Sequence, residues 1–180
     1  MARLILASSS PRRRELLEQL GLVFDIYSPD IDESVQAGES VAYYVERLAC
    51  AKADAIVIAA DTSLGVDQEI LGKPESKQHA FEMWEKISGR NHDVYTGVCI
   101  RTNTQISSIV VRTEVEFQHL SLNDMEAYWA TSEPIGKAGA YAIQGIAARY
   151  IPRIEGSYSN VVGLPLHETV QLLQAVKALN

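Results

Sequence analysis

The amino-terminal part of the chain reads as a strand, a helix and a second strand. Residues 3–7 are short and mostly apolar, which is typical of a buried strand, and residues 15–21 carry leucines at helical spacing before a terminal glycine. Ser10 suits the N-cap of this helix, and Pro11 suits its first helical position. Residues 23–28 are the second predicted strand.

A helix, a central strand and another helix follow. Residues 40–53 place apolar side chains on one face at helical spacing. Residues 55–60 form a continuous apolar run, which indicates a strand covered on both faces. We expect that strand to end at Asp61. Residues 76–88 begin with a capping serine and stop at Gly89, as a helix does.

The second half of the chain mixes strands with helices. In chain order it predicts strands 93–101 and 106–119 joined as a hairpin across 102–104, a helix that starts at a capping box from Ser121 to Asp124, a strand over 147–154, a turn over 155–157 and an amphipathic helix over 165–179. Apolar and polar side chains alternate along 106–119, which fits a sheet with one wetter, more solvent-exposed face. This order predicts an α/β protein with a mixed, mostly central sheet flanked by helices. The length of 180 residues suits a single domain over 1–180.

Composition and charge narrow the function classes. A hydrophobic content of 47% and a charged content of 22% are ordinary for a globular protein, and the net charge of −7 argues against nucleic-acid or acidic-membrane partners. Cys50 and Cys99 form no CxxC or zinc pattern, so we expect buried thiols in a reducing compartment. With no signal peptide and no run of membrane-spanning length, we expect a cytoplasmic protein.

The strongest chemical signal is the turn Ser8-Ser9-Ser10-Pro11-Arg12-Arg13-Arg14. Three arginines fall in the first helical turn, where the helix dipole is already positive. An anion would resolve this conflict, because backbone N–H groups, serine hydroxyls and guanidinium groups converge on it. The alternative is a solvated basic helix start with Arg14 paired to Glu18. No Walker loop occurs in the chain, so the turn predicts a phosphate or carboxylate site of another kind.

Each of the other candidate residues is, taken alone, a weaker signal. Asp61 follows a buried strand, where α/β folds place ligand chemistry, although it could instead cap a turn. The loop around Asp30, Asp32 and Glu33 could be a solvated connector. Lys52 near a helix end and Lys73 before a proline could both be structural. Three glycines within residues 134–145 permit close approach to a ligand, or equally serve tight turns.

Taken together, these segments resemble the Maf family of nucleoside triphosphate pyrophosphatases over nearly the whole chain. The resemblance rests on Ala7-Ser8-Ser9-Ser10-Pro11-Arg12-Arg13, Asp32-Glu33, Lys52, Ala60-Asp61-Thr62, Gly72-Lys73-Pro74, Lys137-Ala138-Gly139-Ala140-Tyr141 and Gly163-Leu164-Pro165-Leu166. It implies a Maf-like fold similar to inosine triphosphate pyrophosphatase, with a ligand cleft between two lobes. It also implies a homodimer.

The resemblance implies hydrolysis between the α and β phosphates of a nucleoside triphosphate. Catalytic positions map onto Asp61, Glu33, Lys52 and Lys73, and substrate-binding positions onto Ser8, Arg12, Arg13, Thr62, Lys137 and Gln144. Asp61 is the expected proton acceptor for the attacking water, assisted by Mg²⁺ or Mn²⁺. Glu33 and Asp61 are the expected metal ligands, since a hard cation prefers oxygen. Only residues 53 to 60 separate Lys52 from Asp61, a shorter spacing than in typical members.

Three positions indicate the subgroup. Arg12, Thr62 and Gln144 look like those of the members acting on dTTP and UTP, and an amide can pair with the O4/N3–H edge of a pyrimidine. Modified pyrimidine nucleotides are further candidate substrates in a housecleaning role. The alternatives are a 7-methyl-GTP pyrophosphatase of the same family and a non-catalytic nucleotide-binding regulator of septum formation. The second would need the phosphate cradle but not the carboxylates.

Overall fold

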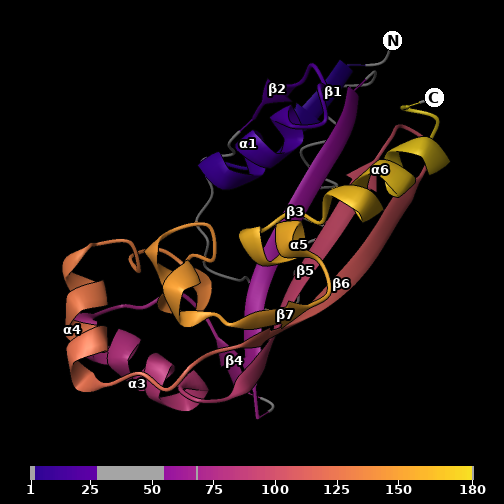
Figure 1. The fold of residues 1–180 in the computed structure, drawn as a ribbon. Coiled ribbons are helices and arrows are strands. Elements are labelled where there is room, and N and C mark those ends of the chain that lie inside the picture. The colour runs from indigo at the N-terminus through magenta and orange to yellow at the C-terminus, as the bar shows by residue number, and fades with distance from the viewer. Residues whose placement is uncertain (1–2, 28–54, 68, 180) are drawn as a thin grey trace. The chain divides into compact units, whose positions relative to one another are not determined.

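A mixed β-sheet organises the computed structural model, which describes residues 3–27, 55–67 and 69–179 (Figure 1). In chain order the described elements are β1 (Arg3–Leu6), α1 (Pro11–Glu18), β2 (Asp25–Ile26), β3 (Ala55–Val66), β4 (Glu69–Leu71), α3 (Lys77–Ile87), β5 (Asn91–Arg101), β6 (Ile106–Glu116), α4 (Leu122–Ala130), the 3₁₀-helices η1 (Ala138–Ala140) and η2 (Ile146–Tyr150), β7 (Arg153–Glu155), α5 (Tyr158–Val162) and α6 (Leu166–Ala175). The helix predicted over 40–53 lies outside the described residues.

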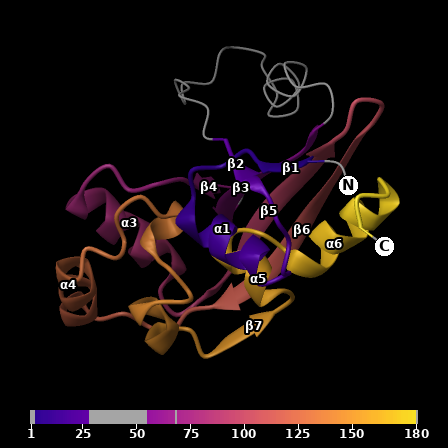
Figure 2. The same cartoon turned by 90° about the horizontal axis from the view of Figure 1, so that it is seen from above.

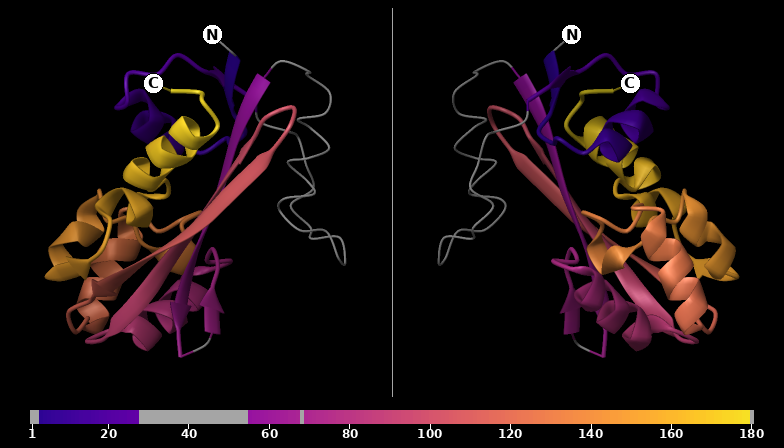
Figure 3. Two further views of the ribbon diagram at one scale, coloured as in Figure 1. Left: turned by 90° about the vertical axis from the view of Figure 1, so that its right-hand side faces the viewer. Right: turned by 90° about the vertical axis from the view of Figure 1, so that its left-hand side faces the viewer.

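The sheet contains both strand directions. Its strand order is β2-β1-β3-β5-β6-β7, and β4 also pairs with β3. β1 pairs in parallel with β2 and with β3, whereas β4 on β3 and β7 on β6 are antiparallel. β5 and β6 form a long hairpin (Figure 3). The predicted α/β class with a mixed sheet is therefore confirmed, while the ligand cleft between two lobes stays a prediction.

The chain divides into two compact units. Unit 1 combines Met1–Asp61, Gly97–Val110 and Gly163–Asn180, and unit 2 combines Thr62–Thr96 and Val111–Val162. β3, β5 and β6 each contribute residues to both units. The single domain over 1–180 stays a prediction.

Unit 1 is built on the apolar strands that the sequence predicts. Ile5, Val57 and Ala59 form one buried cluster, with Ala7 packed against it. α1 buries Leu16 and Leu17, in agreement with the predicted leucine stripe, and Gly21 follows the helix with a φ of +68°. The second strand is shorter than predicted, because β2 covers only Asp25–Ile26 of residues 23–28.

β3 corrects one prediction that matters for the site. The strand runs to Val66 instead of ending at Asp61. Beyond Asp61 the pattern changes from a continuous apolar run to alternation, in which Leu64 and Val66 are buried. β4 pairs with this second half of β3 through Leu64 and Leu71. Asp61 therefore lies inside a strand and not at its carboxyl end.

Unit 2 contains the two helices with the clearest caps. In α3 the Ser76 hydroxyl accepts the His79 N–H, and in α4 Ser121 and Asp124 form a complete capping box. α3 and α4 contact each other and lie side by side (Figures 1 and 2). Side chains of both helices belong to an aromatic cluster of Phe81, Trp84, His92, Phe117, Tyr128, Tyr141 and Tyr150.

Several predicted boundaries in the second half are wrong. Residues 147–154 are not one strand, because η2 covers Ile146–Tyr150 and β7 only Arg153–Glu155. β6 stops at Glu116, after which the backbone bonds to other segments: the Phe117 N–H donates to the Arg90 carbonyl. α6 ends at Ala175 and not at 179, and Lys177 has a φ of +57°.

α5 (Tyr158–Val162) was not predicted. Cys99 is a buried free thiol, as expected, and burial raises its pKa; Cys50 lies outside the described residues. Within residues 3–27, 55–67 and 69–179, no helix has both the length and the apolar character needed to cross a bilayer.

Candidate active site

The turn between β1 and α1 is held by the Ser8 hydroxyl. The Ser10 N–H donates to Ser8 Oγ at 3.2 Å. Ser10 occupies the N-cap position and Pro11 begins the helix, as predicted, although the Ser10 side chain makes no capping hydrogen bond. The first N–H groups of a helix have no intrahelical acceptor, and here they follow a turn that Ser8 holds.

Arg13 is anchored at two points within unit 1. Its Nε donates to the Gly163 carbonyl at 2.9 Å, and its Nη1 donates to Ser8 Oγ at 3.3 Å. These contacts join the first helical turn to the residue that precedes Leu164-Pro165-Leu166. The Arg13 guanidinium is thereby held in one orientation at the start of α1.

The electrostatics of Arg12 and Arg13 favour an anion. Burial lowers the pKa of Arg13; the Asp61 carboxylate opposes this effect and the Arg12 charge adds to it. Burial also lowers the pKa of Arg12, with Glu15 acting in the opposite direction. Two partly buried positive charges beside a helix N-terminus raise each other's electrostatic cost, which a bound polyanion would relieve.

Arg14 behaves differently from its two neighbours. It is exposed, and its Nε donates to Glu18 Oε1 at 2.8 Å one helical turn along. The solvated alternative is therefore correct for Arg14. Arg12 and Arg13 remain as the basic side chains of the candidate site.

Asp61 is the last residue of the first segment of unit 1 and lies on β3. Its side chain is exposed and close enough to Arg13 to act on its pKa. Because side chains alternate along a strand, Asp61 and Thr62 point to opposite faces. Unit 1 thus brings together Ser8, Arg13 and Asp61, three of the predicted site residues.

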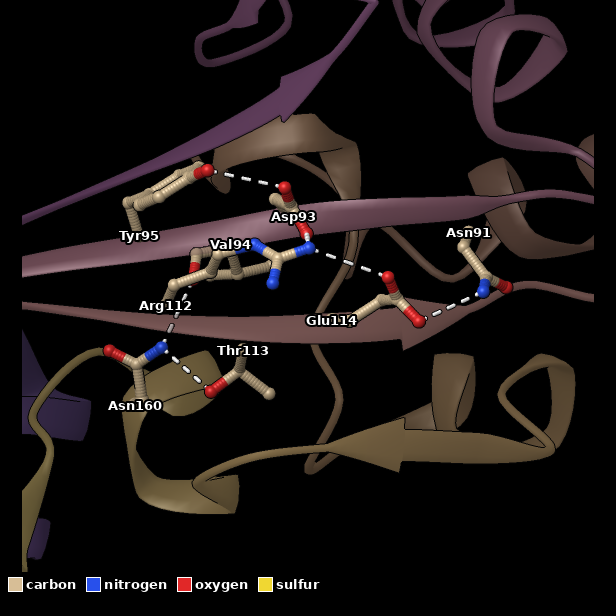
Figure 4. Close-up of polar contacts among 8 residues, drawn as sticks. All are labelled: Asn91, Asp93, Val94, Tyr95, Arg112, Thr113, Glu114 and Asn160. Atoms are coloured by element: carbon tan, nitrogen blue, oxygen red, sulfur yellow. Dashed lines mark hydrogen bonds and ion pairs between the residues drawn. The ribbon is translucent and has the colours of Figure 1, made fainter.

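Thr62 belongs to a buried polar chain in unit 2. Thr62 Oγ1 lies 2.9 Å from Thr96 Oγ1, and the Thr96 hydroxyl donates to the Asn160 carbonyl at 2.9 Å. Since Thr96 has only one hydroxyl proton, Thr62 must be the donor to Thr96. Asn160 is fully buried, and its Nδ2 donates to the Val94 carbonyl at 3.1 Å and to Thr113 Oγ1 at 2.9 Å (Figure 4). The Thr62 hydroxyl proton is thus directed to Thr96, and Thr62 Oγ1 could meet a ligand only as an acceptor.

The neighbouring surface of β5 and β6 carries charges that pair with one another. Arg112 lies 2.7 Å from Asp93 and 3.4 Å from Glu114. Asn91 donates to Glu114 at 2.9 Å, and Tyr95 donates to Asp93 at 3.2 Å (Figure 4). This surface agrees with the predicted wetter face of the sheet. Its compensated charges indicate a solvated surface and not a ligand site.

The segments that carry Lys73 and Lys137 lie next to each other in unit 2. The Gly139 N–H donates to the Gly72 carbonyl at 3.0 Å. Gly139 has a φ of +65°, and a Cβ on it would lie 2.5 Å from Leu64 Cδ1. Gly139 is therefore needed for its left-handed backbone and for its close contact with Leu64. At this position the glycine-rich segment has the structural role that the sequence left open.

Gln144 is exposed on a β-turn of unit 2. The Gly145 N–H donates to the Ala142 carbonyl at 3.0 Å and closes the turn. Lys137 Nζ donates to the Ile135 carbonyl at 3.2 Å. Unit 2 therefore holds four of the predicted residues: Thr62, Lys73, Lys137 and Gln144.

Two predicted residues, Glu33 and Lys52, lie outside the described residues. In residues 3–27, 55–67 and 69–179, no group of three His, Cys, Asp or Glu side chains is placed to hold a metal ion. The sequence reasoning assigned no role to the Gly163 carbonyl, Thr96 or Asn160. Gly163 lies in a segment that the resemblance includes, but a backbone acceptor leaves no signal of its own.

Comparisons with known proteins agree on one family. The family model described as Maf-like protein matches residues 3–176. A dTTP/UTP pyrophosphatase of Acinetobacter baylyi is 65% identical over 183 residues, covering 97% of this chain and 100% of that protein. Proteins of the same name from Vibrio cholerae and Myxococcus xanthus are 48% and 49% identical, covering 96% and 95% of this chain and 97% and 91% of their own.

The structural comparison is more distant. The Ham1 protein of Staphylococcus aureus superposes with a TM-score of 0.48 at 15% identity, covering 64% of this chain and 71% of that one. A likeness at this level supports no conclusion about fold or function.

Proposed function

Because the chain belongs to the Maf-like protein family, we propose that it is a nucleoside triphosphate pyrophosphatase that hydrolyses dTTP and UTP to the monophosphate and pyrophosphate. The names of the relatives that are 65%, 48% and 49% identical support the substrates. The observation that carries the chemistry is the grouping of Ser8, Arg13 and Asp61 in unit 1 at the start of α1. Modified pyrimidine nucleotides are further candidate substrates.

The reaction needs charge neutralisation more than covalent help. The α–β phosphoanhydride is a polyanion, and its hydrolysis depends on positioning and on stabilising the charge that develops on the phosphate oxygens. In this proposal Arg12 and Arg13 bind phosphate oxygens, and Ser8 with Gly163 holds the Arg13 guanidinium. Asp61, an exposed carboxylate beside these cations, accepts the proton of the attacking water.

The family resemblance assigns further binding roles to Lys73, Lys137 and Gln144. Lys73 and Lys137 come from adjacent segments, which the hydrogen bond between Gly139 and Gly72 joins, and they neutralise further phosphate charge. Gln144 presents an amide to the edge of the pyrimidine. Lys52 and Glu33 are assigned by the family resemblance.

A divalent cation, Mg²⁺ or Mn²⁺, completes the proposal. Asp61 offers the hard oxygen donor that such ions prefer, and Glu33 is the proposed second carboxylate. Mg²⁺ typically binds through one or two carboxylates together with phosphate oxygens and water, which fits a pair of carboxylates at a polyphosphate site. When bound, the cation would supply positive charge at the phosphates. We also propose a homodimer, on the family resemblance, and a cytoplasmic location, which the sequence analysis predicts; light scattering of the purified protein tests the dimer.

The test is pyrophosphate release from dTTP, UTP, CTP, GTP and 7-methyl-GTP, with Mg²⁺ or Mn²⁺ present. Asp61→Asn keeps the size of the side chain but removes the proton acceptor, so we expect turnover to fall at least a hundredfold while nucleotide binding persists. Asp67→Asn is the matched control. Asp67 is exposed, pairs with Arg90, and has a φ of +48°, which asparagine tolerates.

Release from dTTP and UTP that Asp61→Asn removes and Asp67→Asn leaves intact would support the proposal. Preference for 7-methyl-GTP would overturn the substrate assignment but keep the enzyme. Binding without turnover of any nucleotide would instead indicate the regulator. Normal turnover by Asp61→Asn would remove the assigned proton acceptor.

A further inference from the structure

The turn that carries Gln144 is held from both sides. Its two central residues point in different directions, since Ile143 is buried and Gln144 is exposed. On the amino-terminal side, the Ala142 N–H donates to the Tyr128 hydroxyl at 3.2 Å. On the carboxyl-terminal side, the Ile146 N–H donates to Glu133 Oε2 at 2.8 Å and the Ala147 N–H to Glu133 Oε1 at 3.2 Å.

Tyr128 and Glu133 are themselves joined. The Tyr128 hydroxyl donates to Glu133 Oε1 at 2.7 Å. Tyr128 is buried and packs against Trp84 in a tilted arrangement, with ring centroids 5.3 Å apart. The pair therefore connects the backbone on both sides of the turn to the aromatic core of unit 2.

Gly145 makes room for this arrangement. A Cβ on Gly145 would lie 2.1 Å from Glu133 Oε2. The φ of Gly145 is −110°, so glycine is required here for space and not for a left-handed backbone. The carboxylate of Glu133 thus occupies the position that a side chain on the turn would otherwise fill.

We propose that Glu133 and Tyr128 are positioning residues for base recognition, which fix the turn Ala142–Gly145 so that Gln144 meets the pyrimidine of the substrate. This inference rests on the proposed function. Glu133 can accept from two adjacent N–H groups at once because a carboxylate has two acceptor oxygens. An amide at the same position would face one of these N–H groups with a donor, and the turn would lose that hydrogen bond.

The proposal predicts that substitution of Glu133 weakens binding that depends on the base and leaves binding of the phosphates unchanged. The probes are a non-hydrolysable dTTP analogue with a methylene bridge between the α and β phosphates, and inorganic tripolyphosphate, which has no base. Dissociation constants for both are measured by calorimetry in wild type, Glu133→Gln, Gln144→Ala and the double variant. Glu85→Gln, an exposed glutamate on α3, is the matched control.

We expect Glu133→Gln to weaken binding of the dTTP analogue about tenfold, the scale of one lost hydrogen bond, and to leave tripolyphosphate binding unchanged. In the Gln144→Ala background the same substitution should change the dissociation constant less than twofold, because the side chain that the turn positions is already missing. Glu85→Gln should match wild type. Should Glu133→Gln not fold, Tyr128→Phe removes one hydroxyl that serves both sides of the turn and should give the same selective loss.

Three results would overturn the inference: unchanged analogue binding, an equal loss of tripolyphosphate binding, or a tenfold loss that persists in the Gln144→Ala background. The proposed function fails separately. Wild type that binds the analogue but releases no pyrophosphate from dTTP would refute the enzyme while leaving the positioning role supported. Wild type that does not bind the analogue would refute both.

Discussion

Gly139→Ala is expected to destabilise unit 2 because the site leaves no room for a methyl group. The new Cβ would lie 2.5 Å from Leu64 Cδ1 and 3.4 Å from Leu64 Cγ. Leu64 is 2% exposed, so its side chain cannot move out into solvent. The next residue provides a useful contrast: Ala140 has a φ of +57° and carries a Cβ, so the backbone of this segment accepts alanine in the left-handed region.

The expected change in the free energy of unfolding is the sum of three contributions. Overpacking a buried site costs about 1–3 kcal/mol, and an alanine in the left-handed region costs about 1–2 kcal/mol. The reduced entropy of the unfolded chain returns about 0.4–1 kcal/mol. The free energy of unfolding should therefore fall by about 3 kcal/mol, with the clash against Leu64 as the largest part.

Denaturant unfolding monitored by tryptophan fluorescence measures this loss. The chain has two tryptophans, Trp84 and Trp129, and both lie in unit 2, so the signal reports that unit. The cycle includes Leu64→Ala alone and with Gly139→Ala. Because the smaller side chain removes the clash, the double variant should be more stable than additivity predicts, by about 1–3 kcal/mol.

An unfolding midpoint within experimental error of wild type would refute the steric argument. So would strict additivity of the two substitutions, because it would place the whole cost in the backbone conformation. Ala140→Gly serves as the matched control, since it exchanges the same two residue types at the neighbouring position without adding an atom.

Two other predictions concern the anion site and the buried histidine. Arg13→Lys keeps the charge, but a lysine has one side-chain nitrogen and cannot replace both contacts, with the Gly163 carbonyl and with Ser8 Oγ. Tripolyphosphate binding measured by calorimetry should therefore weaken about tenfold. Arg14 is exposed and paired with Glu18, so Arg14→Lys should bind as wild type, and equal effects of the two substitutions would contradict the assignment. Burial lowers the pKa of His92 to about 4, with Asp93 opposing. Since the unfolded chain takes up this proton near pH 6.5 and the folded protein only near pH 4, the free energy of unfolding should fall by about 3 kcal/mol as the pH drops through that window. His92→Phe should show a smaller fall in denaturant titrations at each pH, and an equal fall would refute the role of His92.

Local chemistry explains which parts of the fold were predictable. Ser76 with Gly89 marks both ends of α3, and Ser121 with Asp124 marks the start of α4, because capping involves only residues close in sequence. The extension of β3 also left a signal, since Leu64 and Val66 alternate with polar or small residues. The strand was nevertheless predicted to end at Asp61, because the pattern changes there from a continuous apolar run to alternation.

Distant contacts explain what could not be predicted. The apolar character of residues 147–154 resembles a strand, but Glu133 binds the N–H groups at the start of η2 from 13 and 14 residues away. Candidate site residues were found where side-chain type carries the chemistry, as for Ser8, Arg13 and Asp61. The acceptor for Arg13 is a backbone carbonyl, which every residue has, so only the folded chain identifies Gly163.

The hydrogen bond between Arg13 and Gly163 joins positions 150 residues apart, and this separation sets an order of assembly. A ribosome delivers the chain from its amino terminus, and earlier segments begin to fold while later ones are still being made. Arg13 therefore leaves the ribosome 150 residues ahead of its acceptor. A stalled or truncated product that stops before Gly163 has the arginines but not the contact that orients Arg13, so the anchoring of Arg13 requires the chain to extend through Gly163.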